Sequence, residues 1–235
     1  MNVFIAIDDT DNTESIGTGR LSRNLGKELS RLGMIKNMNV TRHQFLVHPD
    51  IPYTSHNSCS CIAAFTDSSL DDIFKTSQDF LVNNFHESAN PGLCVIEDKV
   101  VPDELRTFGY RAKREVLTIN EARTLAEKLR LNLWWYGETG QGCIGAIAGV
   151  GLRSTGDDGR FIDLHGIRDI EGTATVKDII SKSDVKKVVT LDGKSLPDHE
   201  IIETDGWVRP SLYGGEIVFY VIRDGDTWRP DKTRV

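Results

Sequence analysis

The 235-residue sequence contains no apolar run close to the roughly 18 residues that a membrane-spanning helix needs. The short apolar stretch at residues 3–7 has no basic segment before it, and acidic residues follow it at once, which argues against a signal or transit peptide. We therefore expect a protein that stays in the cytoplasm and has no membrane partner.

Cysteine is scarce, and the sequence has no C-x-x-C pair. The cysteines are Cys59, Cys61, Cys94 and Cys143, and each lies among apolar or small neighbours. Paired cysteines are the usual signature of a structural zinc site, whereas scattered cysteines in apolar surroundings are typical of buried thiols. The sequence predicts reduced cysteines in the core, with a zinc site as the alternative.

Positive charge is also in deficit, since 28 lysines and arginines face 35 aspartates and glutamates and give a formal net charge of −7. This balance excludes a protein whose main property is nonspecific attraction to nucleic acid. One local basic stripe remains, because Arg20, Arg23, Lys27 and Arg31 are spaced by three, four and four residues along one helix face. The stripe is either a solvated surface or a face toward an anionic substrate.

Strand and helix patterns alternate along the chain. Residues 3–7 form a β-branched and aromatic run that ends at the turn-prone segment Asp-Asp-Thr-Asp-Asn, and leucines with helical spacing follow until Gly33. Further strands are expected at 39–47, 58–65, 93–96 and 131–136, and further helices at 70–81, from the capping box Thr118–Glu121 to Leu129, and at 146–150. The predicted fold class is α/β or α+β, with helices packed on a mixed sheet.

The pattern changes beyond Ser154. Residues 155–159 read as a turn, one helix is expected at 176–181, and short strands separated by Gly and Asp turns fill the rest. We predict a nucleotide-binding region at residues 1–155 and a small α+β region at residues 156–235.

Three carboxylates, Asp8, Asp9 and Asp11, lie within four positions at the end of the first predicted strand. Crowded carboxylates that lose hydration repel one another unless a cation or strong donors neutralise them. Magnesium is commonly held by one or two carboxylates together with substrate phosphates, so the pattern predicts a magnesium and phosphate site with these residues as ligands and catalytic groups. The alternative is that one or two of them cap the next helix or form a turn at Asp11-Asn12.

Thr18 follows Gly17 at the expected start of the first helix, where free backbone N–H groups attract phosphate. Its hydroxyl could bind a metal or accept a phosphoryl group, or could simply cap the helix. Farther along, Gly140, Gly142 and Gly145 form a G-x-G-x-x-G pattern between a strand and a helix. Backbone N–H groups there could approach phosphate, or the glycines could serve close helix–strand packing.

Two other sets of titratable residues are candidates for catalytic or metal-binding groups. Glu138 lies beside the glycines, where it could orient a second metal or a nucleophile, or could be exposed to solvent. His43, His48 and His56 are close in sequence, but their spacing has no standard metal-ligand form, so surface or hydrogen-bonding roles are expected.

Several segments, in order, together resemble one family. They are Ile7-Asp-Asp-Thr-Asp11 with Thr18, His48-Pro-Asp-Ile-Pro to Asn57, Asn90-Pro-Gly92, and Gly140-Gln-Gly-Cys-Ile-Gly-Ala146. This combination is similar to the archaeal isoleucine-tRNA agmatidine (2-agmatinylcytidine) synthetase family, whose corresponding motifs read I-D-D-T-D, N-P-x-I-P-x-K-T-R-G-N, N-P-G and G-x-G-x-I-G-A. The resemblance covers about residues 1–151, the kinase-like and ferredoxin-like portion of that family.

The resemblance implies an ATP- and magnesium-dependent reaction. In the family, the 2-carbonyl oxygen of the wobble cytidine is phosphorylated, and the amine of agmatine then displaces the phosphate. Carried over by motif, Asp8, Asp9 and Asp11 would hold magnesium on the triphosphate, and Thr18 would lie at the phosphoryl-transfer centre. The glycines and Asn57 of the matched motifs, together with Glu138 beside the glycines, would belong to the cofactor-binding set.

The sequence departs from the family in two respects. We expect no counterpart of the family's oligonucleotide-binding barrel and zinc ribbon, and the basic K-T-R of one motif reads Thr54-Ser55-His56 here. We therefore predict a shortened ATP-dependent ligase that acts on a tRNA or a small-molecule acceptor with an agmatine-like amine. The alternatives are a nucleotide-binding regulatory or interaction module without turnover, and carboxylates that bind a metal for stability alone.

Overall fold

The computed structural model describes residues 1–12, 14–53, 56–137 and 139–233. The chain divides into two compact units, Met1–Thr155 (unit 1) and Gly156–Val235 (unit 2). Within the described ranges, none of the helices combines the length and the apolar character that crossing a membrane requires.

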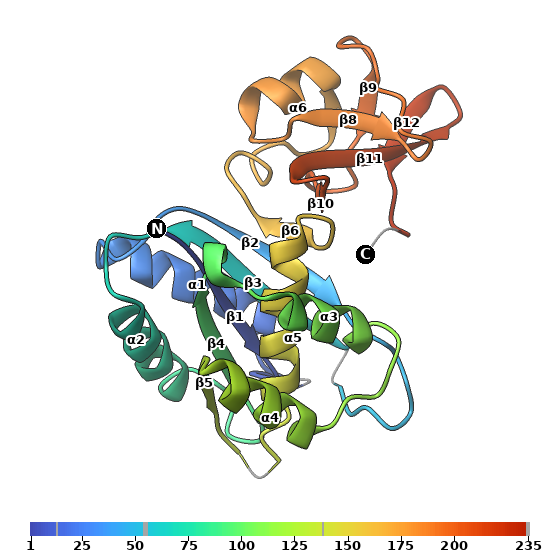
Figure 1. Ribbon diagram of the computed structural model, residues 1–235. Coiled ribbons are helices and arrows are strands. Elements are labelled where there is room, and N and C mark those ends of the chain that lie inside the picture. Colours follow the sequence, from blue (N-terminus) through green and yellow to red (C-terminus); the bar gives the residue numbers. More distant parts are fainter. Residues whose placement is uncertain (13, 54–55, 138, 234–235) are drawn as a thin grey trace. The chain divides into compact units, whose positions relative to one another are not determined.

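Unit 1 is built on a sheet in the order β5-β4-β1-β3-β2, in which every neighbouring pair is antiparallel. The strands are β1 (Asn2–Asp8), β2 (Lys36–Gln44), β3 (Ser58–Phe65), β4 (Gly92–Glu97) and β5 (Asn132–Trp135). Helix α1 (Thr18–Arg31) joins β1 to β2, and helix α2 (Leu70–Val82) joins β3 to β4 (Figure 1). This β-α-β-β-α-β order is the ferredoxin-like split βαβ arrangement.

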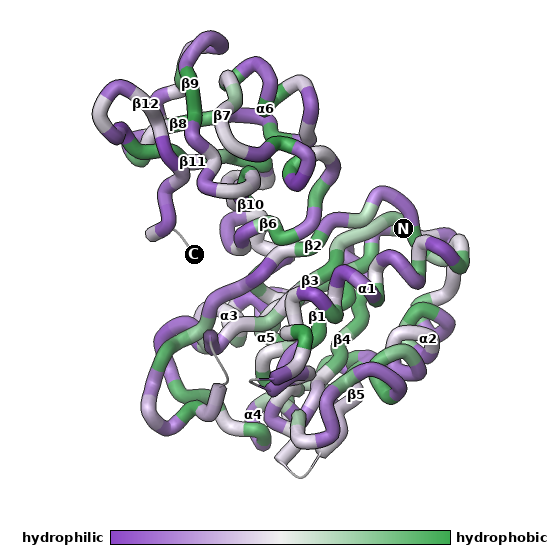
Figure 2. Tube along the Cα trace, turned by 180° about the vertical axis from the view of Figure 1, so that it is seen from behind, coloured by the Kyte–Doolittle hydropathy of each residue, from purple (hydrophilic) through white to green (hydrophobic). Residues whose placement is uncertain are grey.

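The side chains of the central strand β1 alternate between the two faces of the sheet. Phe4 and Ala6 belong to the core cluster formed with helices α3 (Asp103–Ala112), α4 (Ile119–Leu129) and α5 (Gly142–Thr155). Asp8 continues this alternation and therefore points to the same face, which α5 covers. The strands β1, β3 and β4 form the hydrophobic centre of the unit (Figure 2).

The predicted helix starts agree with the structure where a capping residue marks them. Ser69 accepts a hydrogen bond from Asp72 N at the start of α2, and Thr118 and Glu121 form both bonds of the predicted capping box of α4. The first helix ends at Arg31, just before Gly33, whose φ of 73° is a left-handed conformation that favours glycine.

Three sequence-based expectations were wrong in detail. Helix α3 was not predicted, and β2 spans Lys36–Gln44 instead of residues 39–47. Helix α5 begins at Gly142, inside the segment predicted to be a glycine loop, instead of at residue 146. Glycine costs an isolated helix about 1 kcal/mol per residue, but burial of α5 against the sheet overrides that propensity.

Unit 2 has the strand order β6-β10-β11-β12-β9-β7, with β8 paired to β11. Its elements are β6 (Arg160–Asp163), β7 (Thr173–Thr175), α6 (Val176–Lys182), β8 (Lys187–Thr190), β9 (Ile201–Glu203), β10 (Ser211–Tyr213), β11 (Glu216–Asp224) and β12 (Thr227–Pro230). The β8–β11 and β9–β12 pairs are parallel and the others antiparallel. A core that includes Phe161, Ile179 and Phe219 holds the unit together. The predicted class, helices packed on a mixed sheet, is confirmed.

The cysteines are free thiols, and all of them are buried. Burial raises the pKa of the Cys61 thiol to about 12 and that of Cys143 to about 11. These thiols therefore stay protonated near neutral pH, which confirms the prediction of reduced cysteines in the core.

Candidate functional site

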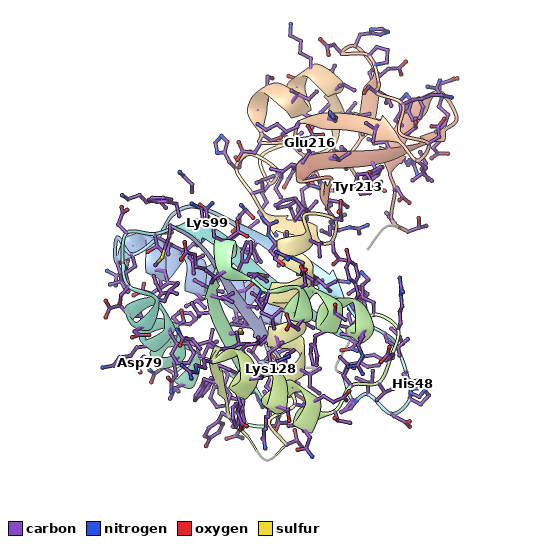
Figure 3. The ribbon with its side chains drawn as sticks, viewed as in Figure 1. His48, Asp79, Lys99, Lys128, Tyr213 and Glu216 are labelled. Atoms are coloured by element: carbon purple, nitrogen blue, oxygen red, sulfur yellow. The ribbon has the colours of Figure 1, made fainter. Side chains whose placement is uncertain are left out.

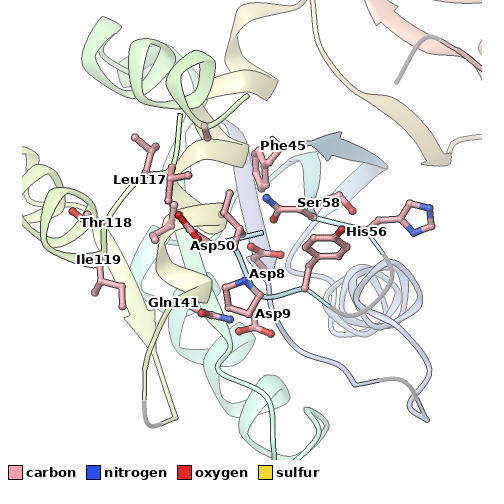
Figure 4. A pocket seen from close by; sticks show the side chains of 18 of the residues that line it. Asp8, Asp9, Phe45, Asp50, His56, Ser58, Leu117, Thr118, Ile119 and Gln141 are labelled. Atoms are coloured by element: carbon pink, nitrogen blue, oxygen red, sulfur yellow. The ribbon is translucent and has the colours of Figure 1, made fainter. Parts of the chain in front are cut away.

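A cavity of about 360 Å³ opens in unit 1 where β1 ends (Figure 4). Its volume lies within the range of small-molecule sites. The lining residues are Asp8, Asp9, Asp11, Thr18, Phe45, Asp50, Ile51, Pro52, Tyr53, His56, Asn57, Ser58, Ala112, Glu115, Val116, Leu117, Thr118, Ile119, Gln141, Ile144 and Gly145. The loop after β1, the loop between β2 and β3, the α3–α4 connection and the start of α5 thus meet around one space.

Asp8 is the last residue of β1 and faces helix α5. Burial raises the pKa of its carboxyl well above the usual value, and the neighbouring charges of Asp9 and Asp11 add to this effect. The helix can approach because Gly145 has no side chain, since a Cβ at this position would overlap the Asp8 carboxylate. One helical turn later, Gly149 lies in the same way against Ala6 and Cys59.

Asp9 is held in a left-handed conformation with a φ of 50°, which is uncommon for a residue with a side chain. Burial raises the pKa of its carboxyl, and the Gln141 side chain and the Asn90 backbone N–H, which face it, act in the opposite direction. Its Oδ2 atom is buried without a hydrogen-bond partner. Leaving a buried carboxylate oxygen unpaired is costly, so this atom can accept a cation.

Asp11 has different surroundings. The Thr18 hydroxyl donates to Asp11 Oδ1 at 3.0 Å and accepts from the Thr10 hydroxyl at 3.0 Å. Of the alternative turn at Asp11-Asn12, the structure shows a side-chain bond at Asn12, whose Oδ1 accepts from Glu14 N at 2.9 Å. The described residues contain no group of three or more His, Cys, Asp and Glu side chains arranged to hold a metal ion. The trio is therefore a partly buried Asp8–Asp9 pair and an Asp11 bound to Thr18.

The structure divides the predicted glycine set. Gly145 lines the cavity, whereas Gly140 and Gly142 are not among the lining residues. Gly140 lies beside Trp135 and Arg123, and a Cβ at Gly142 would lie 2.5 Å from both Asn90 O and Gly92 N. Gly142 thus fits the packing alternative that the sequence left open, and Glu138 lies outside the described residues.

Asn57 lines the cavity and also fixes the β2–β3 loop. Its side-chain Nδ2 donates to Leu46 O at 2.6 Å, and its backbone O accepts from Phe45 N at 2.8 Å. Leu46 N in turn donates to Ala112 O at 2.9 Å, which joins this loop to the end of α3. The two prolines of the loop predicted its fixed shape.

Sequence reasoning missed the opposite side of the cavity. Leu117, from the α3–α4 connection, and Ile119, the first residue of α4, lie across from Asp8 and Asp9 (Figure 4), and Glu115 also lines the cavity. Gln141, inside the glycine segment, was also missed as a partner of Asp9. The α3–α4 residues carried no signal because the helix that positions them was not predicted.

The lining is strongly acidic. It contains Asp8, Asp9, Asp11, Asp50 and Glu115, together with His56, and the described lining residues include no Lys or Arg.

The basic stripe of α1 does not contribute to the cavity, because none of its members lines it. Arg31 pairs instead with Glu28 on the same helix at 2.7 Å, so the solvated-surface alternative describes this stripe. His48 lies at the outer edge of the β2–β3 loop, with Nδ1 3.7 Å from Asp50 Oδ2 (Figure 3). His43 is fully buried and bonds the Thr41 hydroxyl at 2.8 Å, as expected of a hydrogen-bonding histidine.

No family model matches the chain. The isoleucine-tRNA 2-agmatinylcytidine synthetase TiaS of Pyrococcus horikoshii is 31% identical over 158 residues, which cover 64% of this chain and 36% of the relative. The corresponding enzyme of Methanosarcina mazei is 29% identical over 188 residues, 77% of this chain and 43% of the relative. An uncharacterized protein of Methanocaldococcus jannaschii is 29% identical over 64% of this chain and 49% of its own length.

Solved structures agree with these relatives. A tRNA fluorescent labeling enzyme superposes with a TM-score of 0.55 and 25% identity, covering 64% of this chain and 36% of that one. TiaS in complex with its isoleucine tRNA and ATP gives a TM-score of 0.55 and 24% identity over the same shares. The chain spans between about a third and a half of the length of the curated relatives it matches. The resemblance to the agmatidine synthetase family is confirmed as a partial match.

Proposed function

We propose that unit 1 is an ATP- and magnesium-dependent, ligase-like enzyme that phosphorylates an oxygen of its acceptor and lets an amine displace the phosphate. The observation that carries the proposal is the partly buried Asp8–Asp9 pair at the cavity, with one buried and unpaired Asp9 oxygen, in a chain similar to TiaS. Phosphoryl transfer depends mainly on positioning and on neutralising charge, which such a site can provide.

The residues present fit a magnesium ion. Asp8 and Asp9 offer oxygen ligands, and their burial and mutual repulsion disfavour two bare negative charges. When bound, magnesium would supply charge neutralisation for the carboxylates and for the triphosphate. Asp11 would complete the predicted ligand set through Oδ2, because its Oδ1 accepts from the Thr18 hydroxyl. Asn57 and Gly145, which line the cavity, would contact the nucleotide. Gly140 and Gly142 would contribute through the packing of the segment that precedes and begins α5.

Thr18 is proposed to act at the phosphoryl-transfer centre. Its hydroxyl already donates to Asp11, so Asp11 can take the proton when Oγ1 bonds to a phosphorus atom. The P–O bond to the nucleotide then breaks, and the electron pair leaves with the nucleotide. The acceptor oxygen next attacks the same phosphorus, the Oγ1–P bond breaks, and Oγ1 regains its proton from Asp11. Thr10, which donates to the same oxygen, keeps the hydroxyl oriented.

The acceptor and the amine follow from the resemblance and from the charge of the cavity. A lining with five carboxylates and no Lys or Arg among the described residues suits a cationic, agmatine-like amine. The acceptor is proposed to be tRNA, which the relatives' names specify, or a small molecule, and the reaction is placed in the cytoplasm.

Product analysis tests this proposal. The protein with ATP and magnesium should release ADP or AMP, most rapidly with agmatine and a tRNA substrate present, and Asp8→Asn should abolish the release. Asp67→Asn is a matched control, because Asp67 is exposed and pairs with Lys36 outside the cavity. Loss of turnover in both variants, or in neither, would count against the site.

A nucleotide-binding module without turnover is the second candidate. The absence of Lys and Arg from the described lining favours it, because a phosphoryl group in transfer then lacks the cationic side chains that would neutralise its developing charge. Tight binding of ATP with magnesium, but no product with any amine or RNA, would favour this candidate. A melting temperature raised by magnesium and unchanged by ATP would indicate a metal that serves stability alone.

A further inference from the structure

Asn90 is not among the cavity-lining residues, yet its polar groups reach the site in three directions. Its backbone N–H faces the Asp9 carboxylate. Its side-chain Oδ1 accepts from Thr139 N at 3.0 Å, and its backbone O accepts from Gly142 N at 3.0 Å. One residue thus connects the carboxylate with the unpaired oxygen to the segment that precedes and begins helix α5.

The segment it holds reaches the same carboxylate from the other side. Thr139 Oγ1 accepts from Gln141 N at 3.4 Å, and the Gln141 side chain faces Asp9 in the cavity (Figure 4). The bond from Thr139 to Asn90 therefore fixes the start of a short path that ends on Asp9. A shift of residues 139–142 would move Gln141 away from the carboxylate.

The local sequence prepares this arrangement. A residue before proline is restricted to extended conformations, so Pro91 limits the directions of the Asn90 N–H and C=O groups. Two glycines allow the approach, since a Cβ at Gly137 would lie 2.5 Å from Asn90 Oδ1 and a Cβ at Gly142 would lie 2.5 Å from Asn90 O. Pro91 O also accepts from Tyr136 N at 3.0 Å, which holds the chain shortly before residues 139–142.

We propose that Asn90 is a positioning residue that holds Asp9 and the 139–142 segment in the geometry that binds magnesium and ATP. This role rests on the proposed function, because it acts through Asp9 on the ligand. Groups that orient a metal ligand typically change affinity by about 10- to 100-fold when they are removed.

The experiment compares three variants by calorimetric binding of ATP with magnesium and by melting temperature. Asn90→Ala removes the acceptor for Thr139, and Asn90→Asp restores an acceptor oxygen. Thr66→Val is the matched control, because the buried Thr66 hydroxyl also joins backbone segments, donating to Met34 O at 2.7 Å and accepting from Ser68 N at 3.0 Å, away from the cavity.

We expect Asn90→Ala to weaken binding by about tenfold or more, Asn90→Asp to recover part of that loss, and Thr66→Val to bind like the wild type. Both Asn90→Ala and Thr66→Val should lower the melting temperature by a similar few degrees. Unchanged binding in Asn90→Ala, or an equal loss in Thr66→Val, would overturn the positioning role while leaving the proposed function intact. A wild type that binds no ATP would overturn the proposed function, and this role with it.

Discussion

The end of β1 and the start of α5 meet at the same cavity but contribute opposite things to it. The end of β1 brings carboxylates that are crowded and dehydrated, whereas α5 brings glycines whose missing side chains let the backbones touch. The carboxylates at the end of β1 repel one another, which opposes folding and favours binding of a cation. The glycines of α5 allow close backbone packing, which favours folding, and they carry no charge. Substitutions on the two sides should therefore separate ligand binding from stability.

The largest effect on stability is expected from Gly92→Ala, at the first residue of β4, where this strand touches the start of α5. A Cβ at Gly92 would overlap the backbone of Gly142 and Cys143, which cannot move without displacing α5. We expect a loss of about 3 kcal/mol in the free energy of unfolding, measured by urea denaturation, at the upper end of what overpacking costs. Gly26→Ala is the control, because its Cβ would meet the flexible end of Met38 and should cost much less. Equal losses would remove the contrast.

On the acidic side, Asp9→Asn should act mainly on binding. It removes the charge at the unpaired oxygen, so the affinity for ATP with magnesium should fall by about a hundredfold, the upper end of what losing a supporting group costs a metal site. The free energy of unfolding without ligand should not fall, because a buried like charge disappears. Calorimetry and urea denaturation on the same samples measure both quantities, and a variant that unfolds more easily would contradict the comparison.

The pH dependence of stability should reveal Asp8. Its pKa is raised in the folded state, so its stabilising contribution is complete below the unfolded-state pKa of about 3.9 and is lost as the pH rises through the folded-state pKa. Unfolding between about pH 4 and about pH 8 should therefore show wild type losing stability relative to Asp8→Asn as the pH rises. Saturating magnesium should reduce the difference, and parallel pH profiles without metal would refute the assignment.

The smallest effect is expected for Thr18, whose hydroxyl connects Thr10 and Asp11 at the border of the two sides. Thr18→Val keeps the shape and loses these hydrogen bonds, which should cost about 1 kcal/mol of unfolding free energy. Thr18→Ser retains the hydroxyl and should keep most of the stability and any ATP turnover. Full turnover in Thr18→Val would exclude Thr18 from phosphoryl transfer.

Local signals predicted the parts of the fold that local interactions fix. A β-branched and aromatic run placed β1, leucine spacing placed α1, and the Thr118–Glu121 capping box placed the start of α4. Helix α3 went unpredicted, although it packs closely on α5. A Cβ added to Gly109 of α3 would lie only 2.8 Å from Ala148 O of α5, so the two helices pack closely there. Ala148 is more than 30 residues away in the sequence, and a local pattern around Gly109 does not reveal this contact.

The sequence by itself determined that Asp8, Asp9 and Asp11 crowd at a strand end, because residue order alone places them there. Only the tertiary structure decided that they differ. The alternation of β1 points Asp8 at Gly145 of α5, Asn90 and Gln141 come from other elements to hold Asp9, and Thr18 takes Asp11. Burial, hydrogen bonding and close approach are made by residues distant in the chain, so no local pattern could separate three similar carboxylates into these different environments.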